Sequence, residues 1–156
     1  MLTLSSRAFT GGGPIPSRFT CDGPNISPSL AWTGAPPGTR SFALIVDDPD
    51  APDPAAPKRV WVHWVLYNVP ASVAELAEGA SGAGIPSGAR EGKNDGGALG
   101  YGGPCPPIGR HRYFHKLYAL DTVLADLGER AGKAELERAM TGHILAKAEI
   151  MGTYER

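Results

Sequence analysis

The sequence predicts a single, mainly β domain, and three observations support this prediction. Four short runs have the apolar, β-branched and aromatic composition of strands. Between them lie clusters of glycine and proline, 21 and 15 residues in all, which mark turns and structured loops. The length of 156 residues suits one domain, and no linker or internal repeat divides it. We therefore treat residues 1–156 as one unit.

The expected strands differ in how they are covered. The run Ser41–Asp47 (SFALIVD) is continuously apolar, which predicts a central strand buried on both faces. Val60–Val69 and Tyr113–Leu120 mix aromatic and aliphatic residues, and a shorter strand is expected at Ser29–Thr33. The long stretch Glu78–Arg112 shows no regular element, and such stretches in a compact domain are often functional.

Two helices are expected outside the strands. The shorter one begins at Ser72 and ends at Gly79, because Ser72 and Glu75 have the spacing of a capping box. The longer one is a C-terminal helix over Lys133–Met151, with Gly152 as its stop. One apolar stripe runs along it, formed by Leu136, Met140 and Ile144.

Charge and terminal sequence limit the function and the location. A net charge of −1 argues against general nucleic-acid binding, which needs a basic surface. No run approaches the ~20 apolar residues of a membrane span, and Met1–Arg7 lacks the pattern of a signal peptide. We therefore expect a cytoplasmic protein in which Cys21 and Cys105 are free thiols.

A block of carboxylates and prolines, Asp48–Pro52 (DPDAP), directly follows the most apolar run. Each proline fixes its own φ and favours extended geometry in the residue before it. The block therefore predicts a rigid turn that presents Asp48 and Asp50 at a strand end, where binding groups often lie. Taken alone, an acidic solvated turn is the simpler interpretation.

His63 lies in the middle of an apolar, aromatic strand. Strand alternation places it on one face with Trp61, Val65 and Tyr67. A buried imidazole needs a hydrogen-bond partner, and a carboxylate at a neighbouring strand end is the natural candidate. Taken alone, a satisfied core histidine is the simpler interpretation.

The segment from Gly103 to Tyr113 combines glycine, proline, imidazole and phenol groups. Glycine allows close approach of backbone N–H groups to a ligand, and the prolines stiffen the loop. His111 and Tyr113 share a strand face, so we expect an anion receptor here. The glycines do not form a phosphate-binding loop, because no Gly-Lys-Ser/Thr follows them.

Together, the blocks Asp48–Pro52, Trp61–Trp64 and Gly103–Tyr113 resemble the phosphatidylethanolamine-binding protein family. The closer resemblance is to its bacterial and archaeal branch, often called Raf kinase inhibitor-like proteins. Further similarities to the family are Phe19–Gly23, Asn25–Pro28 and Leu117–Asp121. The resemblance covers nearly the whole chain in the expected order.

The resemblance implies an antiparallel Greek-key β-sandwich with a few peripheral helices, and a pocket at one end that accepts phosphate-type groups. The positions that match the family's site are Asp48, His63, His111 and Tyr113 in the pocket, Gly103 and Pro104 in the loop that offers backbone to the anion, and Asp50 and Pro52 in the turn at the mouth. One departure is the short link Ile108–Arg110, where family members commonly have a longer Gly-x-Gly insertion.

The function that this resemblance implies is non-catalytic binding of phosphate, a phosphorylated headgroup or a carboxylate, without a cofactor. Asp48 is expected to orient His63 or His111 and to favour a charged imidazolium that donates to the ligand. This hypothesis predicts weaker phosphate binding above about pH 7.

Two other functions are considered. A hydrolase is disfavoured because the chain has no Cys-x-x-Cys and no Gly-x-Ser-x-Gly motif. Inhibition of a kinase or protease through the pocket rim is implied by the resemblance for some eukaryotic members. The exposed face of the C-terminal helix and the Asp53–Arg59 turn are candidate surfaces for a homodimer.

Overall fold

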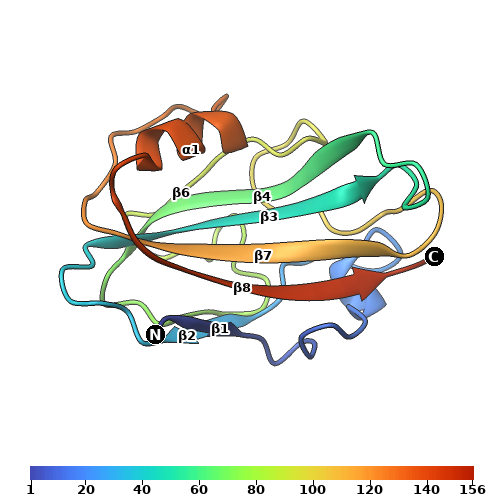
Figure 1. Ribbon diagram of the computed structural model, residues 1–156, viewed down its shortest axis with the longest axis horizontal. Helices are drawn as coiled ribbons and strands as arrows, with labels where there is room; N and C mark the ends of the chain where they lie inside the picture. The colour runs from blue at the N-terminus through green and yellow to red at the C-terminus, as the bar shows by residue number, and fades with distance from the viewer.

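Two antiparallel β-sheets of unequal size form the body of the protein, and the computed structural model describes residues 1–156 (Figure 1). The larger sheet has the strand order β6-β4-β3-β7-β8, and the smaller has the order β1-β2-β5. The elements are β1 (Thr3–Ser5), the 3-10 turn η1 (Ser17–Phe19), β2 (Leu30–Thr33), β3 (Ser41–Ala51), β4 (Arg59–Pro70), β5 (Glu75–Leu76), β6 (Arg90–Glu91), β7 (His111–Leu120), α1 (Lys133–Met140) and β8 (Ile144–Tyr154). The prediction of a mainly β fold with antiparallel sheets is confirmed.

Two cores hold the layers together. The first lies between the sheets, where Trp32 of β2 packs against Phe42 of β3 with ring centroids 5.4 Å apart. The second lies on the other face of the large sheet, where Leu136 and Met140 of α1 cover Ile45 and its neighbours. Figure 1 accordingly shows α1 and the small sheet on opposite sides of the five-stranded sheet.

Strand β3 is the centre of this arrangement, as its continuous apolar run predicts. It pairs with β4 on one side and β7 on the other. Phe42 and Leu44 point into the core between the sheets, whereas Ala43 and Ile45 point toward α1. The rigid turn expected over Asp48–Pro52 is instead the end of this strand as far as Ala51, with the ladder to β4 shifted between Asp48 and Ala51.

Two consecutive carboxylates of β3 serve opposite sides of the sheet. Asp47 is buried and pairs with Lys116 of β7 at 3.1 Å and with Lys133 at the start of α1 at 2.9 Å. Asp48 pairs with His111 on the opposite side. Asp47 therefore fastens the helix to the sheet, while Asp48 belongs to the ion pair with His111 on the other face.

The predicted C-terminal helix is wrong beyond Met140. After a turn in which Gly142 has a φ of 83°, the chain becomes strand β8 and pairs with β7 along its whole length. The apolar period changes from 3.6 to 2, so that Ala146 and Ala148 pack on the inter-sheet core while Lys147 stays exposed. The helix that remains, α1, is too short to cross a membrane.

The predicted helix from Ser72 to Gly79 is also wrong. The segment is a turn followed by the two-residue strand β5, in which Leu76 pairs with Leu30 of β2. Leu76 is buried, and too few apolar residues follow the capping-box spacing to give a helix a face of its own.

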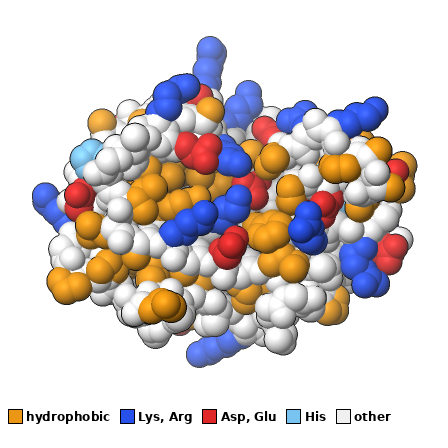
Figure 2. Space-filling model, viewed as in Figure 1, with side chains coloured by type: hydrophobic (Ala, Val, Ile, Leu, Met, Phe, Trp, Pro, Cys, Tyr) orange, Lys and Arg blue, Asp and Glu red, His pale blue; other side chains and the backbone are white.

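Charged side chains of both signs lie across an apolar surface on the face of the molecule seen in Figure 2. This mixture agrees with the net charge of −1, which leaves no large excess of either sign.

Candidate functional site

A pocket of about 490 Å³ lies where β3 ends and β4 begins. Its lining residues are Asp48, Ala51, Pro52, Lys58, Arg59, Trp61, His63, Cys105, Pro106, Pro107, His111 and Tyr113. Strands β3, β4 and β7 form one wall, and the loop before β7 forms the other. The pocket thus brings together the three sequence blocks that predicted a site.

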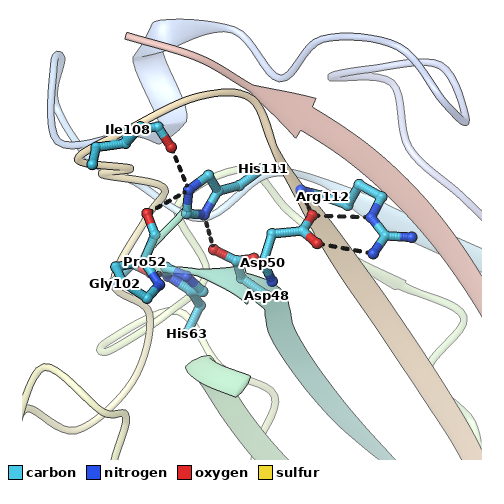
Figure 3. A network of polar contacts seen from close by, with 8 residues as sticks. All are labelled: Asp48, Asp50, Pro52, His63, Gly102, Ile108, His111 and Arg112. Atoms are coloured by element: carbon cyan, nitrogen blue, oxygen red, sulfur yellow. Dashed lines mark hydrogen bonds and ion pairs between the residues drawn. The ribbon is translucent and has the colours of Figure 1, made fainter. Parts of the chain in front are cut away.

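The base of the strand wall is a buried pair between Asp48 and His111 (Figure 3). His111 Nδ1 lies 2.5 Å from Asp48 Oδ2, and both side chains are almost fully buried. His111 Nε2 lies 2.9 Å from the carbonyl oxygen of Ile108 and 3.1 Å from that of Pro52. With Asp48 ionised, every one of these partners is an acceptor, and the geometry then suits a His111 ring that carries a proton on both nitrogens.

The surroundings of His111 therefore favour an imidazolium. Burial opposes the charged form, but the hydrogen bond and charge of Asp48, together with the two carbonyl groups, outweigh it and raise the pKa of His111. The expectation that Asp48 orients a histidine and favours its charge holds for His111. Both ring nitrogens of His111 are engaged by groups of the protein itself.

His63 has a different environment from His111. Its Nδ1 donates to the carbonyl oxygen of Gly102 at 2.7 Å, so the partner is a loop carbonyl and not the carboxylate that the sequence suggested. Burial lowers the pKa of His63, which favours the neutral ring. Nε2 makes no hydrogen bond within the protein, and the ring lines the pocket beside Tyr113, with centroids 5.1 Å apart.

Tyr113 supplies a hydroxyl that has no hydrogen-bond partner in the protein, although its ring is buried in the pocket lining. Burial raises the pKa of Tyr113, so the hydroxyl keeps its proton and can donate it in a hydrogen bond. His63 and Tyr113 are the two polar side chains at the back of the pocket with unused hydrogen-bonding capacity.

Three other residues predicted for the site support it from outside the lining. Asp50 binds Arg112 through both carboxylate oxygens, and these hydrogen bonds and the charge of Arg112 lower the pKa of Asp50. Gly103 donates its N–H to Asn25 Oδ1 at 2.8 Å, so this group is not free for a ligand. Pro104, which is also outside the lining, accepts from the N–H of Cys21.

The need for glycine at position 103 comes from packing. A Cβ there would collide with the backbone of Phe19 and with Asn25 Oδ1.

Of the turn residues, Pro52 does line the pocket, and its carbonyl holds His111.

Sequence reasoning missed the cations and the indole at the mouth. Lys58 lines the pocket, and no ion pair neutralises its ammonium group. Arg59 lies 4.5 Å above the ring of Trp61 and 3.1 Å from Asp95. The signal was the run Pro57-Lys58-Arg59-Val60-Trp61, which places two cations directly before an aromatic strand.

The expected free thiols are wrong, because Cys21 and Cys105 form a disulfide. The two residues are 84 positions apart, and only the fold brings the turn after η1 to the loop wall of the pocket. Cys105 belongs to the pocket lining. The cytoplasmic location, which motivated that expectation, stays a prediction.

The short link Ile108–Arg110 follows the loop wall. The carbonyl of Ile108 holds His111, while Arg110 lies 3.5 Å from Glu155, with both side chains exposed. Arg110 therefore points away from the pocket. No group of three or more His, Cys, Asp or Glu residues is arranged to hold a metal ion.

Comparison with protein families matches residues 5–155 to the family described as phosphatidylethanolamine-binding protein. The chain belongs to this family. It is 52% identical over 156 residues to a UPF0098 protein of Methanothermobacter thermautotrophicus, with 99% of each chain covered. It is also 44% identical over 155 residues to a UPF0098 protein of Chlamydia trachomatis serovar D, again with 99% of each covered.

Solved structures of this family have the same fold. The structure of Escherichia coli YbcL, described as a new member of the mammalian family, has a TM-score of 0.90 and 36% identity, with 99% of this chain and 98% of that chain covered. A Chlamydia trachomatis homologue, CT736, has a TM-score of 0.88 and 44% identity, with 99% and 97% covered. These likenesses establish family and fold, and the ligand has to be argued from the pocket.

Proposed function

We propose that the protein is a non-catalytic binding protein whose pocket takes a small anionic group, either a phosphate ester or a carboxylate. The observation that carries this proposal is the unpartnered hydroxyl of Tyr113 beside His63 at the back of the pocket. The cation of Lys58 lies at the mouth. The charge of Asp48, which would otherwise repel an anion, is offset by the His111 imidazolium.

Anion binding is expected to be coupled to protonation of His63. In the neutral ring Nδ1 carries the proton that goes to Gly102, so Nε2 presents a lone pair that repels an anion. An anion in the pocket favours protonation of Nε2, which then donates to it and raises the pKa of His63 in the complex. Affinity should therefore fall as the pH rises.

Calorimetry with sulfate tests this proposal, because sulfate has the shape of phosphate and does not titrate between pH 5.5 and 8. We expect affinity to fall across this range, by up to tenfold per pH unit where one proton is linked. Titrations in two buffers of different ionisation enthalpy should show uptake of up to one proton. An affinity that does not change with pH would contradict the role of His63.

Two variants locate the binding. Tyr113→Phe removes only the hydroxyl and should weaken sulfate binding about tenfold, the value of one hydrogen bond to a charged group. The matched control is Tyr118→Phe, because Tyr118 lies on the opposite face of the sheet. If the two variants bind sulfate equally well, the anion does not bind at Tyr113.

The proposal has no catalytic step. Asp48 is held by His111, and His63 has a carbonyl as its partner instead of a carboxylate. The side chains of the pocket therefore lack a base poised next to a nucleophile. The purified protein, of known metal content, can be assayed for hydrolysis of phosphate and carboxylate esters. Hydrolysis that is lost in His63→Gln would overturn the proposal that the protein is non-catalytic. A partner protein that presents a phosphorylated or carboxylate side chain would use the same pocket.

A further inference from the structure

Four residues of the loop wall, Cys105–Ile108, form a strap along the pocket. Cys105, Pro106 and Pro107 supply lining atoms. No backbone–backbone hydrogen bond holds any of the four, and the two prolines have no N–H to offer one. The shape of this wall therefore depends on other attachments.

The strap has one attachment at each end, and Pro106 between them is buried. At its start, the disulfide joins Cys105 to Cys21. At its end, the carbonyl of Ile108 accepts from His111 Nε2 at 2.9 Å. Pro106 and Pro107 span the distance between these two points.

The residues just before the strap are held independently. Gly102 donates its N–H to the carbonyl of His63 at 2.9 Å and accepts from the His63 ring. Gly103 is bound to Asn25. Loss of the disulfide would therefore release the Cys105 end of the strap, while the preceding loop stays attached to β4 and Pro104 stays bound to the N–H of Cys21.

Both Cys21 and Cys105 are exposed residues, so the disulfide lies at the surface of the protein. Exposed disulfides are the ones that thiols reach and exchange with, whereas buried structural ones resist. The bond that shapes one wall of the pocket is thus open to reduction.

We propose that the Cys21–Cys105 disulfide is a redox-operated clasp that holds the strap against the pocket. A dithiol reductant opens it by exchange: the protein S–S bond breaks, two protein S–H bonds form, and the dithiol loses two hydrogens to become a disulfide. The oxidised protein has a fixed pocket wall and the reduced protein has a mobile one. A mobile wall must be ordered when a ligand binds, so reduction lowers affinity.

The mobility of the strap is tested first by ¹⁵N relaxation, without any ligand. On reduction with dithiothreitol, the order parameters of the Cys105 and Ile108 amides should fall from roughly 0.85 to below 0.6. Gly102 is the internal control and should keep its value, as should Ile45 and Leu117 in the centre of the large sheet. The variant Cys21→Ser/Cys105→Ser should match the reduced protein and should not respond to dithiothreitol.

Two results overturn the clasp. If Cys105 and Ile108 keep their order after reduction, the strap does not depend on the disulfide. If Ile45 and Leu117 lose order together with the strap, the disulfide is a staple of the whole fold and not a local device.

The second measurement is sulfate affinity, and this arm rests on the proposed function. We expect the reduced protein to bind sulfate about tenfold more weakly than the oxidised protein. Equal affinities with a mobile strap would overturn control of binding by the clasp. If neither form binds sulfate, the proposed function fails and the relaxation result alone decides the clasp.

Discussion

The two walls of the pocket are built in different ways. The strand wall carries Asp48, Trp61, His63, His111 and Tyr113 on β3, β4 and β7, whose hydrogen-bonded ladders fix every backbone. The loop wall is the strap Cys105–Ile108, which is held by one disulfide, one carbonyl and the burial of Pro106. The polar groups proposed for anion recognition lie on the strand wall, and the parts proposed to adjust lie on the loop wall.

The difference shows how one site can be both rigid and adjustable. A group on a ladder moves only if the sheet moves, so its position costs nothing further when a ligand binds. A segment outside the ladders, with few attachments, can move when one of them is released. Changes in the strand wall should therefore affect folding most, whereas changes in the loop wall should affect both stability and binding.

The largest effect is expected from Asp48→Asn in the strand wall. This change leaves a buried His111 without the carboxylate that balances its charge, and removing one partner of a buried pair costs about 3–5 kcal/mol. Urea unfolding at pH 7 measures the loss. The control is Asp53→Asn nearby, whose carboxylate accepts one hydrogen bond, from Ala55, and which should cost less than about 1 kcal/mol. Equal losses of unfolding free energy in the two variants would show that the Asp48–His111 pair stabilises the fold no more than the turn hydrogen bond of Asp53 does.

The next effect concerns the loop wall. Cys21→Ser/Cys105→Ser opens a covalent loop closed over 84 residues and should lower the free energy of unfolding by about 2–4 kcal/mol. That loss is within the stability of an ordinary domain, so the variant should still fold. Urea unfolding of the variant, and of the wild type with and without dithiothreitol, checks it. Reduced wild type and variant should agree, and a difference between them would show that serine itself disturbs the turn.

A third effect lies behind the strand wall, at His115. Complete burial lowers the pKa of the His115 imidazole to about 4, whereas in the unfolded chain it is near 6.5. The unfolded chain thus binds more protons below pH 6.5, and stability falls as the pH decreases toward 4. Between pH 7.5 and pH 5 the loss from this residue is about 2 kcal/mol.

The variant His115→Leu isolates this contribution. Between pH 7.5 and pH 5, the unfolding free energy of this variant should decrease by about 2 kcal/mol less than that of the wild type. Denaturant titrations of both proteins at several pH values give the comparison. Parallel pH profiles would mean that the pKa of His115 is the same in the folded and unfolded chains.

The smallest effect is expected at the mouth, where the two walls meet solvent. Lys58→Met should weaken sulfate binding about threefold, because an exposed cation contributes under about 1 kcal/mol and is screened by salt. The matched control is Lys93→Met, which removes an exposed lysine outside the lining. Calorimetry at two salt concentrations should show the difference shrinking as salt increases. A loss of tenfold or more would make Lys58 a principal ligand group.

The sequence predicted the strand wall better than the loop wall, for a physical reason. Alternation along a strand is a local property, so His63 could be placed in an apolar strand and Tyr113 on the same face as His111 from residue order alone. The pairing of Asp48 with a histidine was predicted, but the engagement of His111 Nε2 could not be, because the carbonyls of Ile108 and Pro52 reach it through loop geometry. The disulfide depends on a distance in space that no local pattern contains.

The C-terminal segment shows the same limit within one element. Leu136 and Met140 of α1 are buried, as the apolar stripe predicted, but Ile144 is exposed at the start of β8. Residues after Gly142 fit a period of 2 as well as one of 3.6, and pairing with β7 decided between them.

The neighbouring carboxylates Asp47 and Asp48 have a consequence for how the chain can change length. Because side chains alternate across a sheet, one residue inserted or deleted within Ser41–Val46 would exchange the sides on which the two carboxylates lie. Lys133 would lose its acceptor and His111 its counter-ion in a single step. Length variation near the pocket should therefore lie in connections that no ladder constrains, such as Pro52–Lys58 and Ile108–Arg110.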